Sequence, residues 1–95
     1  MQKKRTSLES IRDYLEVLSH KDLLQTTILL KANFSQEMYK KYTKYLLNNK
    51  AIEIKGNKIS ITPHGRFLFD RINKIVNEHN ILTDEIIGKA LQGSG

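Results

Sequence analysis

Cysteine is absent from the 95 residues, and no apolar run approaches the roughly 20 residues that a membrane-spanning helix requires. Without cysteine the chain has no disulfide, no thiolate metal ligand and no cysteine nucleophile. The basic start, residues 1–5, leads into a patterned amphipathic segment and not into a continuous apolar stretch, which argues against a secretory signal. We therefore expect a cytoplasmic protein that does not enter a membrane.

The sequence also lacks the motifs of common catalytic and metal sites. There is no G-x-S-x-G elbow, Walker loop or G-x-G-x-x-G, because Gly65 and Gly88 stand alone. The histidines His20, His64 and His79 have no second ligand at metal-binding spacing on a common helix face. We expect no enzyme activity, no cofactor, no metal and no small-molecule ligand.

Positive charge is abundant and unevenly distributed. The net charge is +6, with 13 Lys and Arg against 6 Asp and Glu in residues 1–66, but 3 against 4 in residues 67–95. A lysine surplus can serve solubility alone, whereas segregation along the chain favours an anionic partner for the first part. With 39% hydrophobic residues, the length fits one small globular domain that benefits from pairing.

Residues 6–49 carry the signals of three short helices. Thr6 and Glu9 fit a capping box, which predicts a helix from about 7 to 19. The segment 23–31 predicts a second helix, and Asn33 followed by Ser35 predicts a left-handed turn and the N-cap of a third helix over 36–49. The expected core positions of the first two helices are Leu8, Ile11, Leu15 and Leu18, then Leu24, Ile28 and Leu29.

The third predicted helix separates packing residues from polar residues. At about 100° per residue, one sector holds Met38, Tyr42, Tyr45, Leu46 and Asn49, with Tyr39 at its border. The opposite side holds Gln36, Lys40, Thr43, Lys44 and Leu47. A basic surface helix is often only a solvated face, and a tyrosine platform could stack bases, but the spacing favours core tyrosines.

A β-hairpin and a long helix follow. Apolar and polar residues alternate in 51–55 and 59–62, on either side of a turn at Gly56-Asn57-Lys58. Thr62 can cap a helix whose first residue is Pro63. In that helix a heptad seam recurs at Leu68, Ile72, Ile75, His79, Leu82 and Ile86. An alternative folds the chain back at 77–80, with Thr83 capping a separate short helix.

This order of elements predicts an α+β fold, mostly helical, of the winged helix-turn-helix type with a long C-terminal dimerisation helix. We expect a winged helix-turn-helix DNA-binding domain in residues 1–62, a dimerisation helix in 63–91 and a flexible tail in 92–95. The seam residues would form the dimer contact.

Four stretches carry a likeness to a known family: Lys3-Lys4-Arg5, residues 27–35, Lys40-Lys41-Tyr42 and residues 59–66. In these stretches the chain resembles the small basic winged-helix DNA-binding proteins of archaea, the chromatin-type ten-kilodalton family with a C-terminal coiled-coil helix, and the resemblance covers the chain to about residue 82. The sequence departs from the pattern at Pro63-His64-Gly65. The resemblance implies a homodimer, joined through antiparallel C-terminal helices, whose two winged domains bind duplex DNA.

We therefore expect a dimeric protein that binds double-stranded DNA in the cytoplasm, associated with the nucleoid. Its role would be architectural or transcription-regulatory, or it would coat a plasmid or viral partition or operator site. A protein-interaction module is the alternative from another class. Lys3, Lys4 and Arg5 form an unanchored basic arm that could follow a groove of the DNA. The candidate DNA contacts are these three residues, Gln36, Lys40, Lys41, Thr43 and Lys44 in the third helix, and Lys55, Asn57 and Lys58 in the hairpin.

Overall fold

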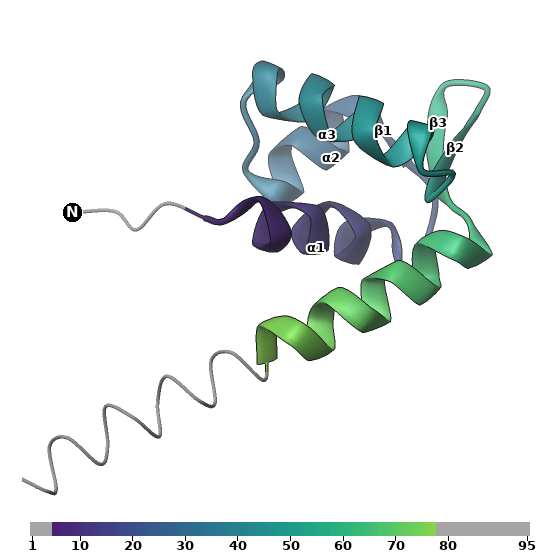
Figure 1. The fold of residues 1–95 in the computed structure, drawn as a ribbon. Coiled ribbons are helices and arrows are strands. Elements are labelled where there is room, and N and C mark those ends of the chain that lie inside the picture. Colours follow the sequence, from purple (N-terminus) through teal and green to yellow (C-terminus); the bar gives the residue numbers. More distant parts are fainter. Residues whose placement is uncertain (1–4, 78–95) are drawn as a thin grey trace, which may run out of the picture.

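The computed structural model describes residues 5–77 (Figure 1). The elements follow the predicted order, with one additional strand, and residues 63–77 are helical; we call this segment the C-terminal helix. The labelled elements are α1 (Ser7–Leu18), β1 (Leu23–Leu24), α2 (Gln25–Ala32), α3 (Gln36–Asn48), β2 (Ile52–Lys55) and β3 (Lys58–Ile61).

Helix α1 begins at the capping box that the sequence predicts. The Thr6 hydroxyl accepts a hydrogen bond from the Glu9 amide at 3.1 Å, and the Glu9 carboxylate accepts one from the Thr6 amide at 3.1 Å. Both bonds satisfy amides that the first turn of a helix leaves without partners. Of the predicted core residues of this helix, Ile11, Leu15 and Leu18 are buried, whereas Leu8 is exposed.

The prediction starts the second helix at residue 23, two residues before α2 begins at Gln25. Leu23 and Leu24 form β1, which pairs antiparallel with β3 through Leu23 opposite Ile59 and Leu24 opposite Lys58. Successive side chains of a strand point to opposite faces. Leu23 is therefore buried and Leu24 exposed, so the predicted core position of Leu24 is wrong, while Ile28 is buried as expected.

The turn between α2 and α3 follows the sequence prediction. Asn33 has φ of 56°, the left-handed conformation that asparagine tolerates at a helix end. Two residues later the Ser35 hydroxyl accepts a hydrogen bond from the Met38 amide at 3.1 Å and caps α3. A short turn thus joins α2 to α3 in a helix-turn-helix arrangement.

Strands β2 and β3 form the hairpin, which we call the wing. The sheet order is β1-β3-β2, and Lys55 lies opposite Lys58 across the two-residue turn Gly56-Asn57. Gly56 has φ of +63°, which glycine adopts at little cost. The predicted Gly-Asn turn is confirmed.

The C-terminal helix is joined to the junction between α3 and β2. The Thr62 hydroxyl accepts from the Gly65 amide at 2.9 Å and donates to the Lys50 carbonyl at 2.6 Å. The Arg66 guanidinium donates to the Ser19 carbonyl at 3.1 Å, next to the end of α1. These bonds, with Thr62 as the predicted cap, fix where the helix starts.

The predicted heptad seam is not one exposed stripe in the described part of the C-terminal helix. Ile72 is buried in the core of its own domain and Leu68 packs against that core, so only Ile75 of the three is exposed. Val76, which the seam did not include, is buried as well. The reason is that the domain itself offers this helix an apolar surface. His79, Leu82, Ile86 and the alternative fold-back lie outside the described residues.

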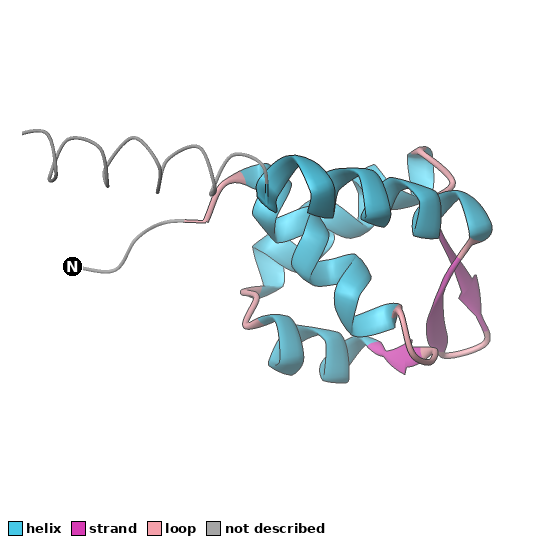
Figure 2. Ribbon diagram, turned by 90° about the horizontal axis from the view of Figure 1, so that it is seen from below, coloured by secondary structure: helices cyan, strands magenta, loops and turns pink. Residues whose placement is uncertain are grey.

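Helix α1 lies at the centre of the domain. Helices α2 and α3 pack on one side of it, and the C-terminal helix runs along the other side (Figures 1 and 2). The wing extends beside the end of α3, which contacts β2. Within residues 5–77, no helix has the length and apolar character needed to cross a membrane.

Candidate nucleic-acid interface

Helix α3 buries one face and exposes another, but its rotation differs from the prediction. Tyr39, Tyr42 and Leu46 are buried, whereas Tyr45 is 46% exposed. The predicted packing position of Tyr45 is therefore wrong. The cause is Tyr14 of α1, whose ring stacks on Tyr39 with centroids 5.9 Å apart and an interplanar angle of 13°. Because this stack holds Tyr39 in the core, α3 is rotated so that Tyr45 lies on its exposed face.

Thr43 contacts α1. Its hydroxyl lies 2.6 Å from the Tyr14 hydroxyl, and the residue is half-buried. Its predicted position on the polar face is therefore wrong. Tyr14 itself is fully buried, and burial raises its pKa far above the ordinary value near 10. The hydrogen bond gives a buried phenol the partner that it requires.

Three lysines dominate the exposed face of α3. Lys40, Lys41 and Lys44 are exposed, and none forms an ion pair with another residue of the segment 5–77. Lys41 also lies with its Nζ 5.3 Å from the centroid of the Tyr42 ring. The remaining exposed residues of α3 are Gln36, Glu37, Tyr45 and Asn48. Two of them, Tyr45 and Asn48, were missed from sequence, since their exposure depends on the rotation of the helix.

The wing adds two more lysines next to α3. Lys55 and Lys58 are exposed and directly opposite each other across the turn, where like charges disfavour the strand pair. Glu53 partly compensates, with its carboxylate 3.5 Å from the Lys55 ammonium. Asn57 is exposed in the turn between the two lysines. The tip of the wing therefore concentrates positive charge.

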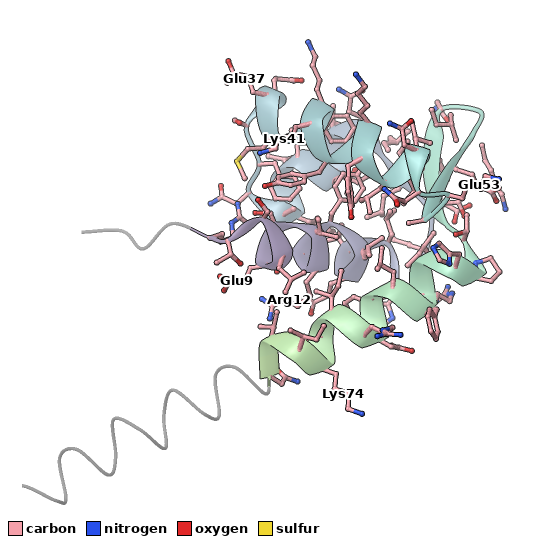
Figure 3. All side chains as sticks on the ribbon, in the orientation of Figure 1. Glu9, Arg12, Glu37, Lys41, Glu53 and Lys74 are labelled. Carbon is pink, nitrogen blue, oxygen red and sulfur yellow. The ribbon has the colours of Figure 1, made fainter. Side chains whose placement is uncertain are left out.

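Charge differs between α3 and α1. Helix α3 has three lysines and one acid, Glu37, whereas α1 has three acids, Glu9, Asp13 and Glu16, and one arginine. In Figure 3, Glu37 and Lys41 lie on α3 while Lys74 lies on the C-terminal helix at the other side. The exposed side of α3 and the wing form a surface that we call the basic face. The C-terminal helix lies on the other side of α1 from α3.

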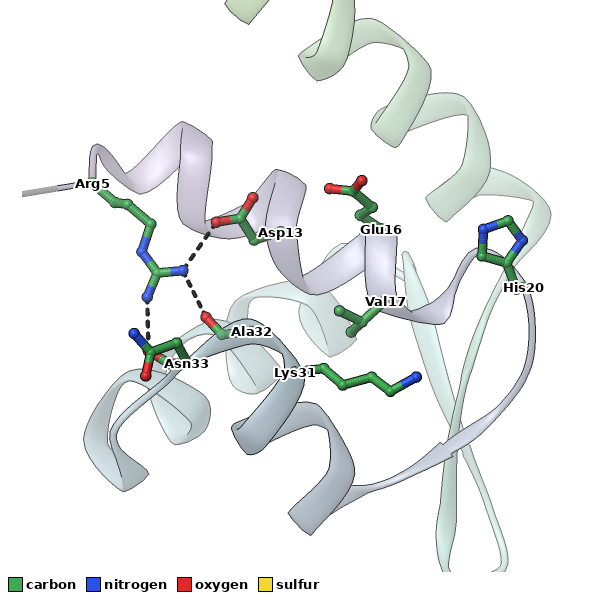
Figure 4. A pocket seen from close by; sticks show the side chains of 8 residues that line it. All are labelled: Arg5, Asp13, Glu16, Val17, His20, Lys31, Ala32 and Asn33. Atoms are coloured by element: carbon green, nitrogen blue, oxygen red, sulfur yellow. Dashed lines mark hydrogen bonds and ion pairs between the residues drawn. The ribbon is translucent and has the colours of Figure 1, made fainter.

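Arg5, predicted as part of a free basic arm, is held inside the domain. Its guanidinium bonds to Asp13 of α1 and to the carbonyl groups of Ala32 and Asn33 (Figure 4). The expectation that Arg5 is unanchored is wrong, because the end of α2 offers it acceptors that the sequence pattern does not reveal. Lys3 and Lys4 lie outside the described residues.

An open hollow of about 660 Å³ lies between α1 and α2 beside Arg5. Its lining mixes both signs of charge, with Asp13 and Glu16 on α1 and Lys31 on α2 (Figure 4). Over residues 5–77, no group of three or more His, Asp or Glu side chains is placed to hold a metal ion. The basic face is therefore the strongest candidate site of the described segment.

Comparison with known proteins identifies the family. The sequence model of the winged helix-turn-helix family matches residues 4–80. An uncharacterized protein of Methanocaldococcus jannaschii is 29% identical over 72 residues, which are 76% of this chain. The chain spans only about a third (34%) of the length of that relative.

Two solved structures share the fold. Sso10a-2, a DNA-binding protein from Sulfolobus solfataricus, has a TM-score of 0.75 and 20% identity, with 92% of this chain and 96% of that chain covered. ZitR from Lactococcus lactis has a TM-score of 0.57 and 18% identity, with 96% and 74% covered. The resemblance to archaeal winged-helix proteins is confirmed, and the chain belongs to the winged helix-turn-helix family.

Proposed function

We propose that this protein binds double-stranded DNA with the basic face. The observation that carries the proposal is that Lys40, Lys41 and Lys44 are exposed together on α3 beside the lysines of the wing. A helix of this kind enters the major groove, while a wing contacts the backbone or the minor groove alongside. The similar Sulfolobus protein is described as DNA-binding, which supports the same role here.

The residues of the basic face divide by chemistry. Lys40, Lys41 and Lys44 would contact phosphates, which position the protein without reading sequence. Gln36 and Asn48, at the two ends of α3, have amides that can pair with the edge of adenine, and Tyr45 offers an apolar ring to a thymine methyl. We add Tyr45 and Asn48 to the predicted contacts and omit Thr43 and Arg5, whose side chains are engaged within the domain. Lys3 and Lys4 remain candidates for an arm.

The experiment is titration of a fluorescent 20-base-pair duplex with the double variant Lys41→Ala/Lys44→Ala. It should bind more weakly, and the slope of log Kd against log salt should fall by about one for each phosphate that the variant no longer neutralises. Lys21→Ala/Lys31→Ala is the matched control, because it removes the same two charges from exposed positions outside α3, the wing and the C-terminal helix. If the double variant and the control bind as tightly as the wild type, the basic face is not the DNA site.

We also propose that the C-terminal helix joins two copies. Phe67 and Ile75 are 57% and 49% exposed on this helix, and with Arg71 and Lys74 they line a hollow of about 320 Å³. The Arg71 guanidinium lies 5.7 Å from the centroid of the Phe67 ring, so its charge covers part of the apolar surface. Large side chains exposed along one helix mark an interaction surface. We propose a second copy of the chain as the partner, because the sequence predicts that the seam continues at His79, Leu82 and Ile86.

Sedimentation equilibrium tests the dimer. The wild type should have about twice the chain mass of 11.0 kDa, and Ile75→Asp should reduce it to a single chain because a buried unpaired carboxylate is costly. Ile54→Asp is the matched control, since Ile54 is similarly exposed but lies on the wing. A wild-type mass of one chain, or an unchanged mass in Ile75→Asp, would remove this helix as the contact.

An architectural protein and a regulator differ in specificity. Similar affinity for unrelated duplexes would indicate an architectural, nucleoid-associated role, whereas one short site bound far more tightly would indicate a regulator or a partition or operator protein. Absence of binding at low salt would favour the protein-interaction module. We propose a binding protein and not an enzyme, located in the cytoplasm with the DNA.

A further inference from the structure

The guanidinium of Arg5 joins three parts of the domain. Its Nη1 donates to the Asp13 carboxylate at 3.0 Å and to the Ala32 carbonyl at 2.7 Å, and its Nη2 donates to the Asn33 carbonyl at 2.9 Å. The guanidinium carbon also lies 5.0 Å from the centroid of the Phe34 ring. One side chain thus contacts α1, the last residue of α2 and the turn that leads into α3 (Figure 4).

These contacts meet at a point where the backbone needs partners. The last carbonyl groups of a helix have no donor within it, and they carry the negative end of the helix dipole. Ala32 and Asn33 provide two such carbonyls, directly before the Ser35 cap of α3. A cation with a planar fork satisfies both at once, which a lysine ammonium on a flexible stem cannot do with the same geometry.

We propose that Arg5 is a positioning residue for DNA binding: it holds the turn between α2 and α3 against α1 and thereby sets the orientation of the first turn of α3. Further along, α3 is held by the Tyr14 contacts with Tyr39 and Thr43. On the N-terminal side of Tyr39, the contacts with α1 are made by Phe34, whose ring lies beside that of Tyr14, and by Arg5, whose guanidinium lies over the Phe34 ring. The role in binding rests on the proposed function of the basic face.

The alternative is that Arg5 contacts phosphate directly, as a basic residue near the chain start suggests. To reach a phosphate, the guanidinium would have to leave two backbone carbonyls and a carboxylate, and its side chain is only 29% exposed. Charge-assisted bonds of this kind are among the stronger ones in proteins. The contacts therefore favour the positioning role.

Arg5→Ala and Arg5→Lys, compared with Arg12→Ala, separate the two roles. Arg12 is the matched control because its guanidinium lies 3.2 Å from the same Asp13 carboxylate and bonds to that carboxylate without bridging to α2. Both Arg5 variants should bind duplex DNA on the order of tenfold more weakly, with the wild-type slope of log Kd against log salt. Arg12→Ala should bind like the wild type. All variants are compared at a temperature where circular dichroism shows them folded.

Two results would overturn the proposal. One is a salt slope that falls by about one in Arg5→Ala and is restored in Arg5→Lys, because this is the behaviour of a phosphate contact. The other is wild-type affinity in both Arg5 variants. Retention of the defect in Arg5→Lys supports positioning, because lysine keeps the charge but has no planar fork.

Amide hydrogen exchange in the free protein tests the same contacts without DNA. The Phe34 amide donates to the Leu29 carbonyl at 3.0 Å and closes the end of α2. Its exchange should be on the order of tenfold faster in both Arg5 variants and unchanged in Arg12→Ala. Unchanged exchange in the Arg5 variants would refute the positioning role whether or not the protein binds DNA. Faster exchange in a protein that binds no DNA would refute only the proposed function.

Discussion

At the scale of single residues, Tyr14 decides how α3 is presented. It is fully buried, and its ring stacks on that of Tyr39. The centroids of the Tyr14 and Phe34 rings are 6.0 Å apart, and the Tyr14 hydroxyl is hydrogen-bonded to the Thr43 hydroxyl. Tyr39 and Tyr45 are equally suited to packing by composition, and the helical spacing places Tyr45 in the packing sector with Tyr39 at its border. The choice is made by a residue of α1 that is distant in the chain.

The raised pKa of Tyr14 predicts a loss of stability in alkali. Burial holds this pKa above its ordinary value near 10, so the folded state keeps a proton that the unfolded chain releases. The stability linked to Tyr14 is present below about pH 10 and falls as the pH rises further. The Tyr14→Phe variant has no hydroxyl to ionise, so it does not lose this stability above about pH 10. At pH 7 the variant should be less stable by about 1 kcal/mol through the missing bond to Thr43.

Thermal melts of both proteins between pH 7 and 11 provide the measurement. The difference in melting temperature should shrink above about pH 10, since only the wild type has a proton to lose at this position. A difference that stays constant over the whole range would show that Tyr14 is not protected from ionisation by burial.

At the scale of elements, the sequence correctly predicted the helix caps and turns, which depend on residues that are neighbours in the chain. The capping box at Thr6, the left-handed Asn33, the Ser35 cap and the Gly56 turn were all found where predicted. Strand β1 was missed because two residues have no period of their own and become a strand only by pairing with β3. The inward position of Ile72 likewise depends on an apolar surface provided by distant residues.

Gly65 tests how closely the C-terminal helix packs on the domain. A Cβ at this position would collide with the Ala51 carbonyl oxygen and lie 2.8 Å from Cγ1 of Ile61. Gly65→Ala should therefore lower the free energy of unfolding by about 1–3 kcal/mol through overpacking, although alanine is the better helix former. His64→Ala, an exposed change in the same turn, is the matched control and should melt like the wild type. An equally stable Gly65→Ala would mean that the helix sits further from the junction of α3 and β2.

At the scale of the whole molecule, two surfaces are kept apart. The basic face lies on one side of α1, and Phe67 and Ile75 belong to the helix on the other side (Figure 1). The proposed contact between C-terminal helices would therefore leave α3 and the wing accessible. Pairing would double the lysines available to one duplex, which raises avidity while each domain stays as it is.

This doubling predicts a steep dependence on salt. Five exposed lysines of α3 and the wing are available in each copy, so two copies could neutralise up to about 10 phosphates. Affinity should then fall on the order of 10³ to 10⁵-fold between about 50 and 200 mM salt. Fluorescence anisotropy over this range measures the slope, and Ile75→Asp should show a shallower one. A change of less than about tenfold in the wild type would refute an interface dominated by phosphate contacts.

Residue-resolved NMR during titration with a short duplex tests whether DNA lies on the basic face, on which the proposed function depends. The amide signals of α3 around Lys41 and Lys44, and those of the wing around Lys55 and Lys58, should shift as DNA is added. Signals of the C-terminal helix around Lys74 should stay in place. Shifts centred on the C-terminal helix or on α1, with α3 and the wing unchanged, would contradict binding at the basic face.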